Sequence, residues 1–238
     1  MRACGARMGI IMEKMILELE QVTGLSKRFR LEDINFALPA GYIMGLMGCN
    51  GAGKTTLISY IMEEKRKYSG AIRIGGVDIR ENHGYMKNKL GFVSEDNTFF
   101  LEKTAMQNAQ LLGAFYEDFD MELFRKTMEE IGLSVKKTYG RMSRGESLKF
   151  QMAFAMAHHP VLYLLDEVTV GMDPVFRIDF FKILQEVIRD EQASVLMTSH
   201  IEEEMERKTD YVGILEQGRM VRFGESIDVI PERRSSIG

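Results

Sequence analysis

Residues 48–56 carry the residue types and spacing that bind a phosphate chain. Gly48 and Gly53 are separated by four residues, and Lys54 and Thr55 follow directly. Glycines let several backbone N–H groups converge on one anion, because no Cβ stands in the way. Lys54 would then reach the β- and γ-phosphates, and the Thr55 hydroxyl would bind Mg²⁺.

The flanks of this segment favour phosphate binding over a chance glycine-rich turn. Residues 42–47 are nearly all apolar, which is typical of a strand buried on both faces. Residues 54–65 have the apolar spacing of a helix. A strand, a glycine-rich loop and a helix form the setting in which this pattern binds phosphate, and the positive end of the helix dipole adds to the attraction.

A second candidate group follows the apolar run of residues 161–165. Asp166 and Glu167 end that run. In a parallel sheet the carboxyl ends of the strands share one edge, where α/β folds bind ligands. We therefore expect Asp166 to hold Mg²⁺ through water and Glu167 to polarise an attacking water. The alternative is a pair of solvated loop acids.

Length and composition limit the fold that can position these side chains. The chain has 238 residues, 45% apolar and 28% charged, which suits one α/β domain with or without an inserted subdomain. The net charge is -4, so no overall basic field attracts nucleic acid, and we expect no nucleic-acid partner. No apolar run approaches the roughly 20 residues of a membrane span. Cys4 and Cys49 form no disulfide framework, which indicates a reducing cytoplasm.

Hydrophobic periodicity predicts strands on both sides of a helical insertion. The predicted strands lie near residues 15–20, 34–38, 42–47, 69–76, 89–94, 161–165, 194–197, 211–216 and 220–223. We expect one domain over residues 1–238, with these parts: a flexible extension (1–14), a catalytic core (15–94 and 157–230), a helical subdomain (95–156) and a tail (231–238). His83, His158 and His159 have no companions at metal-ligand spacing, so we expect them at the surface or in turns.

The order of these motifs resembles the ATP-binding-cassette (ABC) ATPases. Residues 48–56 are similar to the Walker A motif of that family, residues 162–167 to its Walker B motif, and residues 143–145 to its signature loop. The resemblance covers residues 15–224. It implies a P-loop NTPase fold of the α/β class, with a parallel sheet, an antiparallel β subdomain and an inserted helical subdomain.

The resemblance also implies roles for residues outside the phosphate loop. His200 would contact the γ-phosphate, and Asp173 would lie at a dimer interface. Ser143 and Gly145 would bind the γ-phosphate of a nucleotide held by the opposite subunit. Because one chain has only one such loop, catalysis would need a homodimer or heterodimer with two sandwiched nucleotides. The expected nucleotide contacts in the loop itself are Gly48, Cys49, Asn50, Gly51, Ala52, Gly53, Lys54, Thr55 and Thr56.

Several positions depart from the family's usual pattern. Arg144 replaces a glycine of the signature loop and Glu146 replaces a glutamine, which would place a negative charge near phosphate. Glu95 replaces another glutamine; it can still bind Mg²⁺ or water through oxygen, but it cannot donate an amide hydrogen bond. Phe29 is the candidate for stacking on adenine, and it could equally be a core residue that pairs with Leu31.

These motifs predict an ATPase in which ATP and Mg²⁺ are the cofactors and Lys54, Glu167 and His200 the catalytic groups. It would power a separate integral membrane permease, and it would sit in the cytoplasm at the inner face of the membrane. Residues 38–45 and 165–177 are similar to the subgroup that powers exporters of drugs or antimicrobial peptides.

Two other functions remain open from the sequence, and so does the docking surface. The chain would alternatively be a soluble ATPase that remodels a protein or nucleic-acid complex, or a nucleotide sensor with impaired hydrolysis. A permease would dock on the helical insertion near residues 95–100, where Phe99, Phe100 and Leu101 form an apolar cluster in the sequence. The alternative is that this cluster belongs to the core of the helical insertion.

Overall fold

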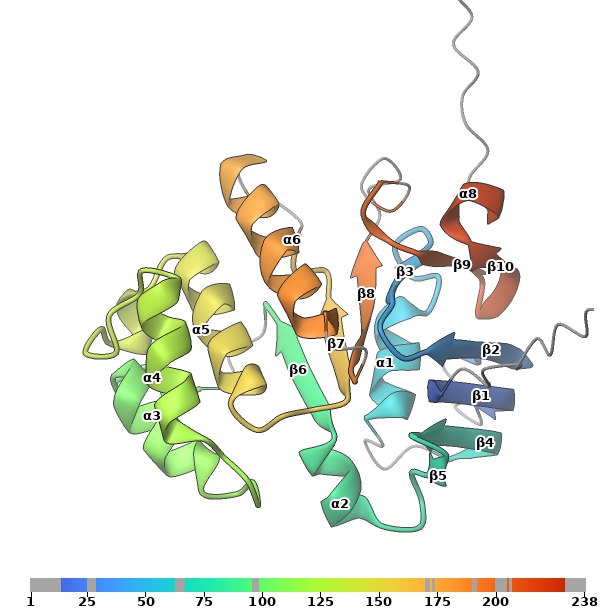
Figure 1. The fold of residues 1–238 in the computed structure, drawn as a ribbon. Coiled ribbons are helices and arrows are strands. Elements are labelled where there is room, and N and C mark those ends of the chain that lie inside the picture. The colour runs from blue at the N-terminus through green and yellow to red at the C-terminus, as the bar shows by residue number, and fades with distance from the viewer. Residues whose placement is uncertain are drawn as a thin grey trace, which may run out of the picture.

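The computed structural model describes residues 14–24, 29–62, 67–95, 99–169, 172, 174–189, 192–199, 205 and 207–229. The larger of two sheets contains, in spatial order, β10 (Arg219–Glu225), β9 (Tyr211–Glu216), β3 (Ile43–Met47), β8 (Ser194–Ser199), β7 (Leu162–Asp166) and β6 (Leu90–Ser94). The smaller contains β2 (Ile34–Pro39), β1 (Met15–Gly24), β4 (Tyr68–Ile74) and β5 (Val77–Asp78) (Figure 1). Among the helices so described, none has both the length and the apolar character of a membrane span.

Parallel pairing in the larger sheet brings the carboxyl ends of its central strands to one edge. β3 pairs in parallel with β8 and β9, and β7 pairs in parallel with β6 and β8. In this register Met47 lies beside Ser199, and Ser94 lies beside Asp166. The segments that follow these strands therefore emerge at the same edge of the sheet, as the sequence predicted. The predicted hairpin is also present, as the antiparallel pair of β9 and β10.

The smaller sheet is antiparallel and shares an apolar core with the larger one. β1 pairs with both β2 and β4 in antiparallel register. Helix α1 (Lys54–Ile61) begins at the end of the phosphate loop. One buried cluster joins Leu19 of β1, Leu57 of α1 and Leu196 of β8. The glycine-rich loop is thus anchored at both ends, because the strand before it and the helix after it are both buried.

Three helices form a block of their own next to the β6 edge (Figure 1). They are α3 (Ala105–Gly113), α4 (Met121–Glu130) and α5 (Arg144–Met156), and a 3₁₀ turn η1 (Tyr139–Arg141) precedes α5. Phe124 and Phe150 are 0% exposed in the centre of this block. Helix α6 (Pro174–Ile188) starts at proline, whose missing N–H is not needed in the first turn, and packs on the larger sheet with Phe180 and Leu184.

The apolar cluster predicted for permease docking is divided by the fold. The Phe99 ring lies 4.7 Å from the Phe150 ring and 5.1 Å from the Phe154 ring, so Phe99 belongs to the core of the helical block. Phe100 and Leu101 are 52% and 50% exposed. Of the two alternatives that the sequence left open, Phe99 therefore takes the core one, since its partly buried ring packs against its own helices.

Short elements differ from the sequence prediction, whereas His158 lies in a turn, one of the two predicted settings. Strand β5, helix α2 (His83–Asn88) and helix α8 (Ser226–Val229) were not predicted, because they are too short to show a periodicity. His158 lies in the turn after α5, but it is buried and not at the surface. Its ring stacks on Tyr116 at 4.0 Å, and burial lowers its pKa to about 4 because the charged form loses water.

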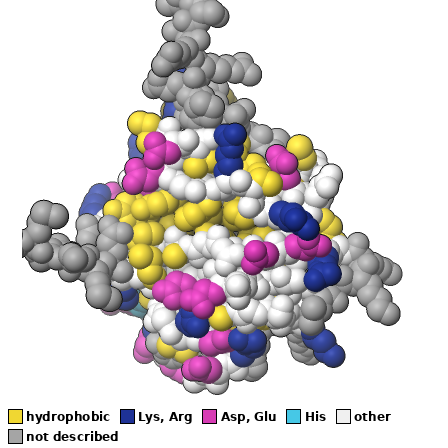
Figure 2. Space-filling model, turned by 90° about the vertical axis from the view of Figure 1, so that its right-hand side faces the viewer, with side chains coloured by type: hydrophobic (Ala, Val, Ile, Leu, Met, Phe, Trp, Pro, Cys, Tyr) yellow, Lys and Arg dark blue, Asp and Glu magenta, His cyan; other side chains and the backbone are white. Residues whose placement is uncertain are grey.

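The side of the molecule on the right of Figure 1 carries a band of hydrophobic side chains between charged groups (Figure 2). Strand β10 and helix α8 lie on this side. Val221 of β10 is 48% exposed and Ile227 of α8 is 73% exposed. This surface is distinct in position from the helical block, which lies at the opposite end of the larger sheet.

Candidate functional site

The centre of the candidate site is Lys54, at the first position of α1. Its side chain is only 4% exposed, and its Nζ atom donates hydrogen bonds to the carbonyl oxygens of Gly48 (2.8 Å) and Cys49 (3.4 Å). The same Nζ lies 3.4 Å from Oε1 of Glu167. The ammonium group is therefore held inside the curve of the loop, beside the carboxylate of Glu167, which directly follows strand β7.

The outer part of the phosphate loop faces solvent. Cys49, Asn50, Gly51 and Thr55 are exposed, whereas Ala52 and Gly53 are buried. The Cys49 thiol is free. Gly53 has φ of 113°, a conformation that glycine adopts without strain. An anion approaching this loop would meet exposed backbone groups and the start of a helix, as phosphate sites require.

Phe29 packs behind the loop and against the apolar core. It is half-buried, and its Cε1 atom lies 2.7 Å from the place that a Cβ on Gly53 would occupy. The sequence left open whether Phe29 stacks on adenine or packs in the core. In the structure it contacts the core and is also a direct neighbour of the loop.

The acidic pair is positioned by Thr198, a residue that the sequence analysis missed. The Thr198 hydroxyl donates to Oδ1 of Asp166 at 2.7 Å and accepts from the backbone N–H of Glu167 at 2.9 Å. Thr198 is 0% exposed, in the buried strand β8. Glu167 has φ of 51°, which turns its side chain sharply out of the strand direction. A hydroxyl that directly follows the apolar run of residues 195–197 in a buried strand was the available signal.

A second missed residue, Gly218, supports the phosphate loop from behind. Its backbone N–H donates to the carbonyl of Ala52 at 2.9 Å, and its own carbonyl accepts from the N–H of Glu32 at 2.8 Å. Gly218 has φ of +84°, and a Cβ there would lie 2.1 Å from the carbonyl oxygen of Arg30. The turn between β9 and β10 therefore fits between the loop and the segment that precedes β2, and only glycine fits this position.

The predicted signature segment forms the start of α5. Ser143 is the N-cap residue: its side chain accepts from the N–H of Glu146, and the Glu146 side chain accepts from the N–H of Ser143 at 2.8 Å. Gly145 lies in the first turn, where a Cβ would contact the Phe176 ring at 3.3 Å. The first turn of α5 thus presents a serine hydroxyl at the positive end of a helix.

The sequence alone suggested that Glu146 would place a negative charge near phosphate. In the structure, this charge is compensated. Both of its carboxylate oxygens accept from Nζ of Lys137 at 2.7 Å. The pKa of Glu146 is lowered, first by the hydrogen bond from Lys137 and then by that from the Ser143 backbone. Its charge is therefore neutralised within its own subunit.

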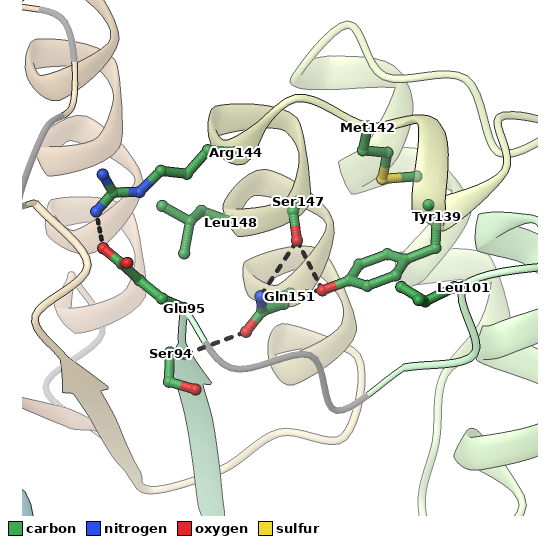
Figure 3. Close-up of a pocket in the computed structure, with 10 residues that line it drawn as sticks. Ser94, Glu95, Leu101, Tyr139, Met142, Arg144, Ser147, Leu148 and Gln151 are labelled. Atoms are coloured by element: carbon green, nitrogen blue, oxygen red, sulfur yellow. Dashed lines mark hydrogen bonds and ion pairs between the residues drawn. The ribbon is translucent and has the colours of Figure 1, made fainter.

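Glu95 follows β6 and forms an ion pair with Arg144 (Figure 3). Beneath this pair, the N–H of Ser94 donates to Oε1 of Gln151 at 3.1 Å. These residues line a cavity of about 420 Å³ between the end of β6, η1 and α5. The structure thus places the Glu95 carboxylate at the start of the helical block, and its binding of magnesium stays a prediction.

The described residues can be tested for a fit to Mg²⁺. Within the described part of the chain, no three or more His, Cys, Asp or Glu side chains lie together in a way that would hold a metal ion. Mg²⁺ does not need such a cage, because it binds through one or two carboxylates, waters and substrate phosphates. The Thr55 hydroxyl and the Asp166 carboxylate are oxygen ligands of this kind, so they fit. His200 and Asp173 lie outside the described residues.

Comparison with known proteins agrees with this geometry. A family model described as "ABC transporter" matches residues 31–170. The chain is 30% identical over 206 residues to the ABC transporter ATP-binding protein YtrB of Bacillus subtilis (strain 168), covering 86% of this chain and 70% of the relative. It is 28% identical over 215 residues to the bacitracin transport ATP-binding protein BcrA of Enterococcus faecalis (89% and 70%).

A third relative and a solved structure point the same way. The linearmycin resistance ATP-binding protein LnrL of Bacillus subtilis (strain 168) is 32% identical over 208 residues, which cover 85% of this chain and 67% of the relative. A structure titled "Structure of ATP binding subunit of ABC transporter" aligns with a TM-score of 0.80 and 25% identity, covering 90% of this chain and 91% of that one. The chain belongs to the ABC transporter family, as an ATP-binding subunit whose ATPase activity is coupled to transport.

Proposed function

We propose that the chain binds MgATP at the phosphate loop and hydrolyses it in a dimer, and that this cycle drives export through a membrane permease. The observation that carries the proposal is the meeting of Lys54 and Glu167, whose charged groups lie 3.4 Å apart at the edge of the parallel sheet. The Lys54 ammonium is suited to a phosphate oxygen, and the Glu167 carboxylate is suited to a water molecule.

Within one subunit, each group has a distinct task. Backbone N–H groups of residues 48–56 bind the phosphates, and the Lys54 ammonium turns from the loop carbonyls to the β- and γ-phosphate oxygens. Glu167, with a side chain that is 36% exposed, accepts a hydrogen bond from the attacking water. Asp166, fixed by Thr198, and Thr55 hold Mg²⁺, which would neutralise charge on the phosphates.

The second subunit supplies the groups that this site lacks. Ser143 and the first amides of α5 would bind the γ-phosphate of the nucleotide in the opposite subunit, because a helix N-terminus attracts anions. His200 would contact the γ-phosphate of its own subunit, and Asp173 would line the dimer interface. The charge of Glu146 does not oppose this arrangement, since Lys137 neutralises it.

The export assignment rests on the relatives. Two of them are named for bacitracin transport and linearmycin resistance. We propose that the cargo is a drug or antimicrobial peptide and that the permease holds this subunit at the inner face of the cell membrane. Phe100 and Leu101 offer the exposed apolar contact on which such a permease would dock.

Replacing Glu167 tests the hydrolytic site and the dimer together. Glu167→Gln keeps the side-chain size but removes the group that polarises water, so ATP binding survives while turnover stops. We expect a dimer in size-exclusion chromatography with light scattering when MgATP is present, and a monomer without it. Glu117→Gln, at an exposed site before α4, is the matched control and should turn over normally.

Two results would contradict the proposal. A Glu167→Gln protein that binds MgATP but stays monomeric would exclude the sandwiched dimer. A wild-type protein that binds MgATP tightly and releases no phosphate, alone or with its permease, would favour a nucleotide sensor.

Purification of the tagged chain from detergent-solubilised membranes should recover an integral membrane protein.

A further inference from the structure

Two acids and two bases at the start of α5 sort into two separate ion pairs. Glu146 pairs with Lys137 through both carboxylate oxygens, at 2.7 Å each. Glu95 pairs with Arg144. Because Glu146 is fully engaged by Lys137 and the Ser143 backbone, Glu95 is left as the carboxylate for Arg144.

The position of Arg144 in its helix calls for an anion. Arg144 is the first residue of α5, where the positive end of the helix dipole disfavours a cation. Glu95, which directly follows strand β6 of the larger sheet, offsets this cost from across the boundary between the sheet and the helical block (Figure 3). The ion pair thus joins the end of β6 to the start of the signature helix.

A deeper contact holds the two elements together without the ion pair. Gln151 of α5 is 3% exposed; its Oε1 accepts from the N–H of Ser94, and its Nε2 donates to the Tyr139 hydroxyl at 3.3 Å. Ser147 donates to the same hydroxyl at 2.7 Å. The backbone position of Glu95 is therefore set by this buried network, and the ion pair decides only where its carboxylate points.

The ion pair itself can exchange partners. The side chains of Arg144 and Glu95 are 39% and 47% exposed, and pairs with this much water around them change an equilibrium by no more than about fivefold. A magnesium ion is a far denser charge than a guanidinium group. The Glu95 carboxylate therefore stays paired with Arg144 only while no stronger cation, such as Mg²⁺, is near.

We propose that Arg144 is a positioning residue for Glu95: it holds the Glu95 carboxylate at the first turn of α5 in the nucleotide-free protein and competes with magnesium for it when nucleotide binds. This inference rests on the proposed function and extends its magnesium site to Glu95, because Ser94 lies beside Asp166 in the sheet and Glu95 directly follows Ser94. Without Arg144, the carboxylate has no competing partner, so less Mg²⁺ suffices to complete the site.

The first experiment measures the Mg²⁺ concentration at half-maximal binding of ATPγS, by titration calorimetry or nucleotide fluorescence. Arg144→Gln should lower this concentration by about twofold to fivefold, the range of an exposed ion pair. Arg144→Lys should behave as wild type. In a Glu95→Gln background, Arg144→Gln should change nothing further, which a general structural effect of Arg144 would not reproduce.

The second experiment uses the nucleotide-free protein without Mg²⁺. Denaturant unfolding of wild type, Glu95→Gln, Arg144→Gln and the double variant forms a double-mutant cycle. We expect a coupling of up to about fivefold in the unfolding equilibrium constant, and its loss at about 1 M salt, because salt screens exposed charges. Lys126→Gln removes an ion pair with Glu130 on α4, away from the site, and should leave the Mg²⁺ requirement unchanged.

The outcomes separate this inference from the function on which it rests. If the wild-type protein binds no nucleotide with Mg²⁺, the proposed function fails, whereas the nucleotide-free cycle still tests the ion pair. If nucleotide binds normally and either the cycle shows no coupling or Arg144→Gln leaves the Mg²⁺ requirement unchanged, the inference is overturned. It is also overturned if Arg144→Gln weakens nucleotide binding equally with and without Glu95, since Arg144 would then contact the phosphates directly.

Discussion

Replacing Gly218 with alanine should damage the phosphate loop from a distance. Gly218 donates its N–H to the Ala52 carbonyl and has φ of +84°, and a Cβ there would lie 2.1 Å from the Arg30 carbonyl oxygen. Gly76 offers a matched control, because it has φ of +82° and a Cβ there would meet nothing within 4 Å. Both substitutions carry the same backbone strain, and only Gly218→Ala adds a collision.

The size of the difference follows from these contacts. A left-handed conformation costs a non-glycine residue about 1–2 kcal/mol, and this term is common to both variants. At Gly218 the collision adds about 1–3 kcal/mol, and a weakened hydrogen bond to Ala52 adds about 0.5–1.5 kcal/mol. The free energy of unfolding of Gly218→Ala should therefore fall about 2–4 kcal/mol below that of Gly76→Ala. For a chain of this size that corresponds to a Tm lower by about 5–15 °C.

The loop should also bind nucleotide less well in this variant. If the hydrogen bond to Ala52 helps to order the loop, its loss weakens nucleotide binding by about twofold to tenfold. Calorimetric titration with MgATP below the Tm of both variants measures this, and Gly76→Ala should bind as wild type does. Equal destabilisation of the two variants, or unchanged nucleotide affinity in Gly218→Ala, would refute the reasoning.

Three further predictions concern the site and its surroundings. Lys54→Met keeps the aliphatic stem and removes the charge, so nucleotide affinity should fall about tenfold to hundredfold by calorimetry, because charged hydrogen bonds contribute about 1.5–3 kcal/mol each; unchanged affinity would reject the role of Lys54. Alkylation of the exposed Cys49 thiol should slow when MgATP is present, and equal labelling by mass spectrometry with and without nucleotide would show that the thiol lies away from it. Burial lowers the pKa of His158 to about 4. Between about pH 6.5 and pH 4 the unfolded chain therefore binds a proton at His158 that the folded chain does not bind. The free energy of unfolding should fall by up to about 3 kcal/mol as the pH falls through this range. His158→Phe should flatten this pH dependence in denaturant unfolding, and an unchanged slope would assign it to other groups.

The chemistry-bearing segments were recognised from sequence because their signals are local. Lys54 lies a fixed number of residues after Gly48, and the acids Asp166 and Glu167 directly follow an apolar run. A strand buried on both faces needs an uninterrupted apolar sequence, and a phosphate loop needs glycines, so both constraints act on neighbouring residues. The buried strands β3 and β7 were predicted on the same grounds.

Other parts of the site depend on residues that are far apart in the sequence. Thr198 reaches Asp166 because β7 and β8 are neighbours in the sheet, and Gly218 reaches Ala52 because a hairpin near the end of the chain folds behind the loop. No periodicity reports such contacts. Phe99 illustrates the same limit, since an apolar residue in a helical insertion has the same sequence signature whether it faces a partner or its own core.

The sequence by itself determined what the site is made of: a phosphate loop, an acidic pair and a signature loop that contains a serine. Only the tertiary structure decided how their charges are shared. Glu146, which looked unfavourable for phosphate binding, is neutralised by Lys137, and Glu95 is turned to Arg144. The reason is physical: the type of a charged group is written in the chain, but its partner is the nearest opposite charge in space.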